Sequence, residues 1–535
     1  MRARTQTSLI WIVLLLVSLL AGALASGGRV TAQGLAEPQV EAALWNILAD
    51  GRQADFIIEM AGQADLSAAY AIQDWDERGQ YVVAALKANA GRSQAGILNA
   101  LEKRGVKATS FYAANLIYVH GGDQPALEAA LRQPGIARVR LPVSAQLTPF
   151  SERLRALGPE LQDLDKPITS WGLEDTLAID FWRAFEKEGD GIIVANIDTG
   201  VDFTHPALLP NYRCQSNPAD PACWYDPSGT CLLINPDGSP CDNHGHGTHT
   251  IGTMAAENAQ NLAYTVGMAP DAQWIACKGC ILTDPDGIPI AEECPAYELL
   301  VCGQWMLAPG GDTANRPHVV NNSWGDVLHD AWYLSTVTAW RAAGIFPVFS
   351  AGNSGATCGS IGSPAEYLDS FAVAAHNEDE DIASFSSRGP GYYGTFTKPN
   401  LSAPGVDIYS TLPGGTFGIK SGTSMSAPHL AGAVALLWSY KDNLIGDIDV
   451  TSQWLQLATD PPPLGTCDEP LDFPGNYTYG TGYLNVLAAG DAPIGMVKGH
   501  VQDEVTELPV PGTVIKAMNG SGDFYSTLSN PAGDY

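Results

Sequence analysis

Ser421-Gly-Thr-Ser424-Met-Ser-Ala-Pro428 decides the fold together with two earlier segments of the same kind. The earlier segments are Asn196-Ile-Asp198-Thr-Gly200 and His244-Gly-His246-Gly-Thr-His249. They supply a carboxylate, an imidazole and a hydroxyl, each beside glycines that can leave the side chain exposed. A serine hydroxyl is a poor nucleophile until a base removes its proton. We therefore interpret Asp198, His246 and Ser424 as candidates for one catalytic set.

Ser424 precedes an apolar run from 427 to 437 that predicts a buried helix. Gly422 and Thr423 bend and cap the entry to this helix, and Pro428 is tolerated because the backbone N–H groups of a first turn have no intrahelical acceptor. A serine at such a position faces the positive end of the helix dipole. Negative charge that develops beside Ser424 would therefore be stabilised.

His246 also begins a predicted helix and is the candidate base, because the pKa of a free imidazole lies near neutrality. Asp198 would hold that imidazole in one tautomer and stabilise its charged form. Asn353, in the glycine-rich turn 350–355, offers a side-chain amide donor for an oxyanion. The backbone N–H of Ser424 would be the second donor.

Short Val-, Ile- and Ala-rich runs alternate with helical stretches between residues 170 and 490, which favours a parallel sheet with helices on both faces. Sites in open parallel sheets lie at the carboxyl ends of strands. Asp198 directly follows one predicted strand and Asn353 follows another, in agreement with this rule. The predicted strands are 191–197, 319–320, 345–350 and 371–375.

These segments resemble the subtilisin family of serine endopeptidases, with a closer similarity to the bacillopeptidase F group. The chain order Asp, His, Ser is that of subtilisin and differs from the orders in chymotrypsin and the α/β-hydrolases. The resemblance covers about residues 170–490. The matching segments are 194–202, 244–255, 267–270, 319–325, 346–355, 383–390, 401–405 and 421–437.

The resemblance implies an α/β fold of three layers with a mainly parallel central sheet. It implies a triad of Asp198, His246 and Ser424, and an oxyanion hole formed by Asn353 and Ser424. It also implies that Ser323, Trp324 and Gly325 on one side, and Ala351 and Gly352 on the other, pair with the substrate as edge strands.

One departure concerns calcium. Many subtilisins carry an aspartate in His-Pro-Asp-Leu, shortly after the catalytic aspartate, whereas this chain has Ala207 there. The site loses a hard oxygen ligand, so structural calcium stays an open expectation and no metal residue is assigned. Asp237 and Asp242 are alternative calcium ligands, but we interpret both as exposed loop carboxylates. The proposed chemistry requires no cofactor.

The N-terminus has the three parts of a secretory signal peptide: a basic start, an apolar run and small residues before the predicted cleavage after Ala25. A second cleavage site after Ala32 and an uncleaved anchor are the alternatives. Secretion is therefore expected, with retention at the cell surface as a variant, and no stable membrane span after signal removal. A spacer is predicted over 33–53.

Residues 54–141 predict a small α+β unit that resembles the inhibitor-type propeptide of subtilisins; an unrelated domain is the alternative. Its own propeptide would then be an intramolecular inhibitor of the enzyme. A polar connector over 142–169 would hold the processing site. The predicted elements are strands 56–58, 82–83, 111–119 and 136–139 and helices 94–104 and 125–131.

From residue 493 to 535 the pattern changes to short strands and turns at 496–501, 512–517 and 523–528. It resembles the start of a carboxypeptidase-regulatory-like β-sandwich. Because a sandwich needs about seven strands, we expect this one to be partial and the chain to be truncated here. A disordered tail is the alternative.

Charge and cysteine content narrow the class of protein. Residues 1–150 carry 13 basic and 12 acidic residues, whereas 151–535 carry 15 and 46, which argues against nucleic acid as a partner. The ten cysteines all lie between Cys214 and Cys467, and their even number behind an export signal predicts disulfides of undetermined pairing. Cys277 and Cys280 alone could form a redox or zinc pair, which we disfavour.

Two other functions, metal binding and a non-enzymatic binding module, fit the sequence less well. His244, His246, His249 and Asp242 could bind a metal, but they lack the glutamate of the zinc motif H-E-x-x-H. A degenerate, non-enzymatic binding module would have lost a triad position, and none is lost here. The sequence thus predicts a secreted serine endopeptidase, made as a self-processing zymogen, that acts through an acyl-enzyme on protein or peptide substrates.

Overall fold

The computed structural model describes residues 38–528 with gaps at 148–150, 154–167, 258–263, 284–288, 393–395, 468–474, 492–500, 504–507, 509, 511–512 and 519–523. The predicted signal peptide lies outside the described residues. Among the helices of the described part, none is long and apolar enough to cross a membrane.

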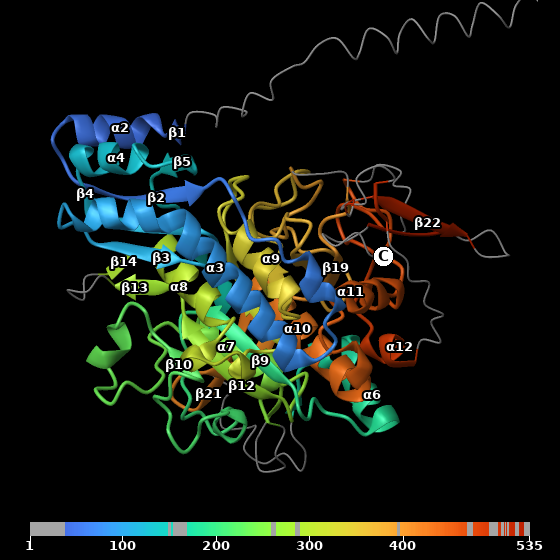
Figure 1. The fold of residues 1–535 in the computed structure, drawn as a ribbon. Coiled ribbons are helices and arrows are strands. Elements are labelled where there is room, and N and C mark those ends of the chain that lie inside the picture. Colours follow the sequence, from blue (N-terminus) through green and yellow to red (C-terminus); the bar gives the residue numbers. More distant parts are fainter. Residues whose placement is uncertain are drawn as a thin grey trace, which may run out of the picture.

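The body of the protein is built on a sheet of seven parallel strands (Figure 1). The four strands predicted from the sequence are all present in it, as β9, β15, β17 and β18. In sheet order the strands are β10 (Trp224–Tyr225), β12 (Gln273–Lys278), β9 (Ile193–Asp198), β15 (Val319–Asn322), β17 (Phe346–Ser350), β18 (Phe371–His376) and β19 (Leu401–Pro404).

Helices cover both faces of this sheet, which gives the predicted three-layer architecture. The helix α7 (His246–Ala255) packs against α10 (Thr423–Tyr440), and both contact the strands of the sheet. The helix α8 (Ala296–Trp305) packs against α9 (Leu334–Ala342), and these contact β12, β9 and β17. Every residue of α10 from Thr423 to Trp438 is buried, as the apolar run predicted. Smaller helices are α5 (Trp171–Asp175), α6 (Ala178–Phe185), α11 (Ile448–Leu457) and α12 (Val486–Asp491).

Residues 38–147, called the N-terminal unit from here on, contain a five-stranded sheet and three helices. The sheet order is β1-β5-β2-β4-β3, and a separate hydrophobic core lies between the sheet and the helices. The strands are β1 (Gln39–Val40), β2 (Ala54–Met60), β3 (Ala108–Phe111), β4 (Leu116–Gly122) and β5 (Ile136–Arg140). The helices are α2 (Ala42–Ala49), α3 (Trp75–Glu102) and α4 (Gln124–Leu131).

Three predictions for this region were wrong. The spacer 33–53 contains β1, which pairs with β5, and α2, whose Leu44 and Leu48 are buried in the core of the unit. Val82–Val83 is a turn of α3 and not a strand, because Val82 packs in the core on the helix face it shares with Leu86. The predicted strand 111–119 is two strands, separated by a turn that ends at Asn115 with φ 46°.

The predicted connector 142–169 contains strands that join the N-terminal unit to the body. The strand β6 (Ser144–Leu147) lies between β14 (Pro289–Pro295) and β16 (Trp324–Gly325), and β13 (Ile281–Thr283) completes that sheet. The strand β7 (Ser151–Arg153) pairs with β21 (Thr416–Ser421), which pairs with β20 (Ile408–Leu412). Further along, β8 (Ile168–Thr169) pairs with β11 (Tyr264–Thr265).

All ten cysteines form disulfides, as their even number predicted: Cys214–Cys223, Cys231–Cys241, Cys277–Cys302, Cys280–Cys294 and Cys358–Cys467. The alternative pairing of Cys277 with Cys280 is wrong. Near the C-terminus, β22 (Val514–Met518) and β23 (Phe524–Leu528) form a hairpin at two of the three predicted strand positions. The third, 496–501, lies almost wholly outside the described residues.

Candidate active site

Asp198 and His246 form a buried hydrogen-bonded pair at the carboxyl edge of the central sheet. Asp198 is the last residue of β9, and His246 is the first residue of α7. The Nδ1–H of His246 donates to Oδ1 of Asp198 over 2.7 Å, and both side chains are fully buried. Asp198 also accepts from the backbone N–H of Thr199 over 2.7 Å and, on its other oxygen, from the hydroxyl of Thr250 over 3.4 Å.

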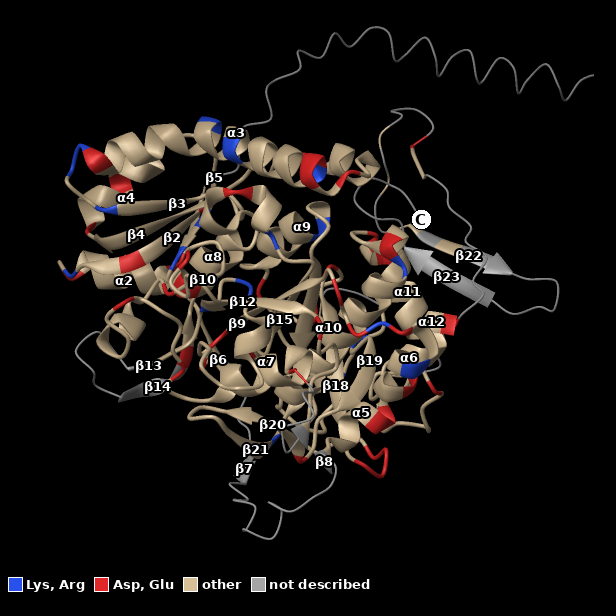
Figure 2. Ribbon diagram, turned by 90° about the horizontal axis from the view of Figure 1, so that it is seen from below, with Lys and Arg blue, Asp and Glu red and all other residues tan. Residues whose placement is uncertain are grey.

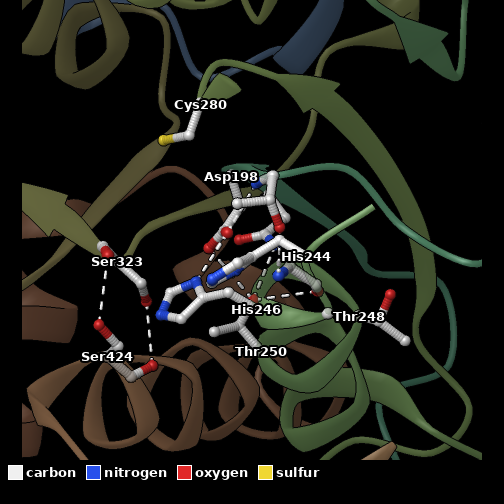
Figure 3. Close-up of polar contacts among 12 residues, drawn as sticks. Asp198, His244, His246, Thr248, Thr250, Cys280, Ser323 and Ser424 are labelled. Atoms are coloured by element: carbon white, nitrogen blue, oxygen red, sulfur yellow. Dashed lines mark hydrogen bonds and ion pairs between the residues drawn. The ribbon is translucent and has the colours of Figure 1, made fainter. Parts of the chain in front are cut away.

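This pair fixes the tautomer of the imidazole. Because the carboxylate of Asp198 can only accept, the proton of His246 sits on Nδ1, and Nε2 is the basic nitrogen. Figure 3 shows the imidazole lying between the carboxylate of Asp198 and the side chain of Ser424. The three segments quoted from the sequence therefore meet in space.

Ser424 lies in the first turn of α10, where the sequence placed it. Its hydroxyl donates to the backbone oxygen of Ser323 over 3.2 Å, and the hydroxyl of Ser323 donates back to the carbonyl of Ser424 over 3.0 Å (Figure 3). This double contact ties the start of α10 to the residue that precedes β16. The candidate nucleophile is thus fixed beside the edge on which β6 lies.

Asn353 follows β17 and lies against the residue before Ser424. Its Oδ1 accepts from the backbone N–H of Thr423 over 2.9 Å and from the Thr423 hydroxyl over 2.8 Å. These two bonds define which end of the amide is oxygen, so the NH2 group of Asn353 points away from Thr423. An orientation of this kind presents a side-chain donor next to the start of α10.

The edge formed by Trp324 and Gly325 is occupied by the chain's own β6. In the antiparallel register Trp324 faces Leu147 and Gly325 faces Gln146. The side chains of Ala145 and Leu147 are buried, whereas those of Ser144 and Gln146 are exposed, as expected for a strand with one face against the body. This edge therefore pairs with an extended segment of the same chain.

The predicted second edge at Ala351 and Gly352 is wrong for the backbone groups that the structure describes. The N–H of Ala351 donates to Val373 of the central sheet. The N–H of Gly352 donates to the hydroxyl of Thr423, and its carbonyl accepts from the N–H of Ser387. Because these groups are used internally, they do not offer an edge to a further strand.

The opposite edge comes from β14, which the sequence analysis did not identify. Glu293, Cys294 and Pro295 pair with residues 144–146. Cys294 is bonded to Cys280, two residues after β12. The even cysteine count was the one signal for this strand, and it could not give the pairing that fastens β14 beside β6.

Asp242 connects the candidate aspartate and histidine segments and is not the exposed loop carboxylate expected from the sequence. It accepts from the hydroxyl of Thr199 over 2.9 Å and from the N–H groups of His244, Gly245 and Thr248 at 2.8–3.0 Å. Burial raises the pKa of this carboxyl, but the neighbouring Lys278 and the hydrogen bonds outweigh burial and lower it. Asp242 therefore stays ionised and holds the start of α7 against the end of β9.

The residues around position 207 do not fit the calcium site of the resemblance. Ala207 is buried and its N–H donates to Nδ1 of His205 over 3.1 Å. A buried methyl group supplies no ligand for a hard cation. His205 and His249 both hydrogen-bond to backbone oxygens through Nε2, and burial lowers the pKa of each. These imidazoles are used in packing the site segments together.

A three-layer parallel fold with a buried His–Asp pair beside a serine at a helix N-terminus defines the class of α/β serine hydrolases. Within that class, residues 189–458 match the subtilase family, and the chain belongs to that family.

Two relatives illustrate the extent of the similarity. Bacillopeptidase F of Bacillus subtilis (strain 168) is 34% identical over 452 residues, which is 79% of this chain and 29% of that protein. Subtilisin Savinase of Lederbergia lenta is 32% identical over 303 residues, 56% of this chain and 91% of that one. This chain therefore spans less than a third of the length of bacillopeptidase F and nearly all of the shorter subtilisin.

Among solved structures, fervidolysin from Fervidobacterium pennivorans, described as a keratinolytic enzyme related to subtilisin, superposes with a TM-score of 0.60. The match covers 93% of this chain and 70% of that one at 20% sequence identity. At that identity the similarity bears on the fold, and it confirms the predicted subtilisin-like architecture.

Proposed function

We propose that this protein is a secreted serine endopeptidase, made as a zymogen that cuts itself between the N-terminal unit and the catalytic body. One observation carries the proposal: the chain's own segment enters the candidate site as β6, between β14 and β16. It continues on the far side as β7, paired with β21, whose last residue Ser421 lies three residues before Ser424. The bond that the enzyme cuts in its own chain is therefore one between these two strands.

The chemistry follows from the arrangement of the three groups. Nε2 of His246 takes the proton of Ser424 as Oγ attacks the carbonyl carbon of the scissile peptide bond. The resulting oxyanion accepts hydrogen bonds from the Asn353 amide and the backbone N–H of Ser424. His246 then returns the proton to the leaving amine, an ester of Ser424 remains, and water hydrolyses it by the same route. Asp198 keeps the imidazole in the required tautomer throughout.

The mode of substrate binding is strand addition. A segment held between β14 and β16 is recognised through its backbone, which allows many sequences to bind. The alternation of buried and exposed positions in β6 gives the only side-chain selection that the described residues indicate: Ala145 and Leu147 face the body. Unfolded or extended regions of proteins are therefore the substrate class.

The location of the self-cleavage site follows from the same strands. The described part of β6 ends at Leu147 and β7 begins at Ser151, so the bond that is cut lies between these two residues. After cleavage, the new C-terminal segment of the N-terminal unit occupies the cleft as a product and inhibits the enzyme. The predicted signal peptide supports export of the precursor, and the five disulfides suit an oxidising compartment.

Replacing Ser424 by Ala tests the proposal. The variant should stay uncut and lose about 10⁶ in turnover on a denatured protein substrate. Ser426→Ala is the matched control, since Ser426 is a buried serine two residues further along α10. Ser426→Ala should mature, and sequencing the N-terminus of its catalytic body should find a first residue within 148–151. A Ser424→Ala chain that matures normally when purified would exclude self-cleavage.

A further inference from the structure

The first turns of α3 bind the body at a place remote from the candidate active site. Arg316 and His318 lie just before β15, Ala342 is the last residue of α9, and Gly344 lies between α9 and β17. These positions are at the amino edge of the parallel sheet, whereas Asp198 is at its carboxyl edge. With 28 residues, α3 is about 42 Å long, and it runs from the small sheet across the body toward α9 and α11 (Figure 2).

Arg78, in the first turn of α3, is buried and donates to three backbone oxygens of the body. Its Nε donates to Ala342 over 2.6 Å, one terminal nitrogen to Gly446 over 3.0 Å and the other to Arg341 over 2.9 Å. Two of these acceptors lie at the C-terminal end of α9, where the helix dipole favours a cation. The planar guanidinium matches this set of carbonyls, and a lysine ammonium would not reproduce it.

Trp75, the first residue of α3, fills a slot in the same surface. Its ring stacks on His318 with centroids 4.6 Å apart, and the guanidinium of Arg316 lies 3.8 Å from its centroid. The slot exists because two glycines form its floor. A Cβ on Gly344 would lie 3.0 Å from Cζ3 of Trp75, and a Cβ on Gly446 would lie 3.6 Å from that atom.

The body contributes a second buried arginine, Arg316, which binds the start of α3. Arg316 donates to the backbone oxygen of Trp75, and also to Ala343 over 3.1 Å and Thr313 over 2.9 Å. The helix approaches so closely that a Cβ on Gly79 would lie 2.5 Å from Nη1 of Arg316. A glycine inside a helix is destabilising relative to alanine, and this close approach of Arg316 explains the glycine at position 79.

We infer that Trp75 and Arg78, called the anchor from here on, form a second docking site that keeps the cleaved N-terminal unit on the catalytic body. This inference rests on the proposed function, because it concerns the state after the cut. The occupant of the surface is a named segment of this chain, the helix start 75–79.

Because of the anchor, cleavage of the chain does not by itself release the N-terminal unit from the body. Cleavage frees β6 to leave the cleft, but the anchor does not involve the cut peptide, so the unit stays at high effective concentration above the active site. Strands β3 and β4 also contact α8, where the N–H groups of Tyr112 and Ala113 donate to Gln304. The anchor adds to that interface a contact at the opposite edge of the sheet from the catalytic groups, and its loss speeds the release of the cleaved unit.

The experiment uses the full chain with Ser424→Ala and a recognition sequence for a site-specific protease inserted within 154–167. Added protease separates the unit from the body without using the chain's own chemistry. Retention is measured as co-elution in size exclusion and as the dissociation constant after dilution. Arg78→Ala and Trp75→Ala should each raise that constant at least about 30-fold, as for buried hot-spot residues. Arg92→Ala removes an exposed arginine of the same helix and should change it less than twofold.

Arg78→Lys covers the case in which an alanine variant does not fold, because it keeps the charge and most of the length. It should weaken retention by at least about tenfold, since it cannot serve three carbonyls. Equal retention of the Arg78→Lys and Arg92→Ala chains would overturn the inference, and so would immediate separation of the cut parent chain. A wild-type chain that never cuts itself would instead count against the proposed zymogen function, and the anchor measurement would still stand.

Discussion

The N-terminal unit contacts the catalytic body through β6, through the anchor and through the packing of β3 and β4 on α8, and the first two of these contacts differ in kind. At the carboxyl edge of the sheet, β6 is held on both sides by backbone pairing with β14 and β16. At the amino edge, the anchor binds through its side chains. The guanidinium of Arg78 donates to three backbone carbonyls, and the indole of Trp75 packs on two glycines.

The difference shows how one surface of the body can accept many sequences while another accepts a single partner. Backbone pairing accepts nearly any extended sequence, which an endopeptidase needs for its substrates. Side-chain shape and a fixed guanidinium accept one partner, which an inhibitor that must stay bound needs. Four changes test this difference between backbone pairing and side-chain recognition. In order of decreasing effect, they remove the catalytic base, remove the oxyanion donor, protonate His318 beside the anchor and disrupt the pairing of β6.

The largest effect is expected for His246→Ala. Loss of the base should lower turnover by about 10⁶ and leave the chain uncut, because the hydroxyl of Ser424 then has no proton acceptor. Both contacts of the N-terminal unit should remain, since His246 takes part in neither. Turnover of a fluorogenic peptide and gel analysis of the precursor measure this. A variant that still matures would show that another group acts as the base.

Asn353→Ala should have the next largest effect, about 10²–10³ in kcat, or roughly 3–4 kcal/mol of transition-state stabilisation. The substrate-binding edge is untouched, so KM should change little. Asn353→Asp is the informative companion, because it keeps an acceptor for Thr423 but has no amide donor. If the aspartate variant retained full turnover, the Asn353 amide would not be the oxyanion donor.

The elements that could be predicted from the sequence are those whose structure is determined by neighbouring residues. The segments around Asp198, His246 and Ser424 carry their own glycines, caps and apolar runs, so their positions at strand ends and helix starts followed directly. Four strands of the central sheet were predicted for the same reason, because buried parallel strands are continuous apolar runs.

Long-range contacts carried no such signal. The pairing of β14 with β6 depends on a disulfide whose partner is not written in the sequence. The edge role of Ala351 and Gly352 failed because their backbone groups bond to Thr423 and Ser387, far along the chain. Within α3, the two valines 82–83 have high strand propensity, yet packing in the large core that the unit shares with the catalytic body decides for helix.

The anchor should respond to acid through His318. Burial, followed by the charges of Arg316 and Arg213, lowers the pKa of this imidazole from 6.5 to about 3. Its Nδ1 accepts from the N–H of Ile193 over 2.9 Å, so the folded chain needs the neutral form. Between pH 6.5 and 3 the unfolded chain binds a proton that the folded chain does not. The free energy of unfolding therefore falls with falling pH in this window, by about 2 kcal/mol at pH 5.

Urea unfolding of the Ser424→Ala chain at pH 8 and pH 5 measures this loss. The His318→Gln chain is the control, because a glutamine oxygen can accept from Ile193 without titrating. The difference between the two chains in their change from pH 8 to pH 5 isolates His318. Identical changes in both chains would contradict the prediction and leave the anchor independent of pH.

The smallest effect is expected at β6, where backbone pairing is spread over several residues. Gln146 has an exposed side chain, but β6 is paired on both sides, so its N–H faces a partner strand whichever way it points. Gln146→Pro removes that donor, costs about 1 kcal/mol and should slow self-cleavage by about fivefold to tenfold. Gln146→Ala keeps the N–H and should cut at the wild-type rate. If the alanine variant cut itself as slowly as the proline variant, the body would also recognise the side chain of Gln146 in β6. The distinction between β6, which is recognised through its backbone, and the anchor, which is recognised through its side chains, would then be wrong.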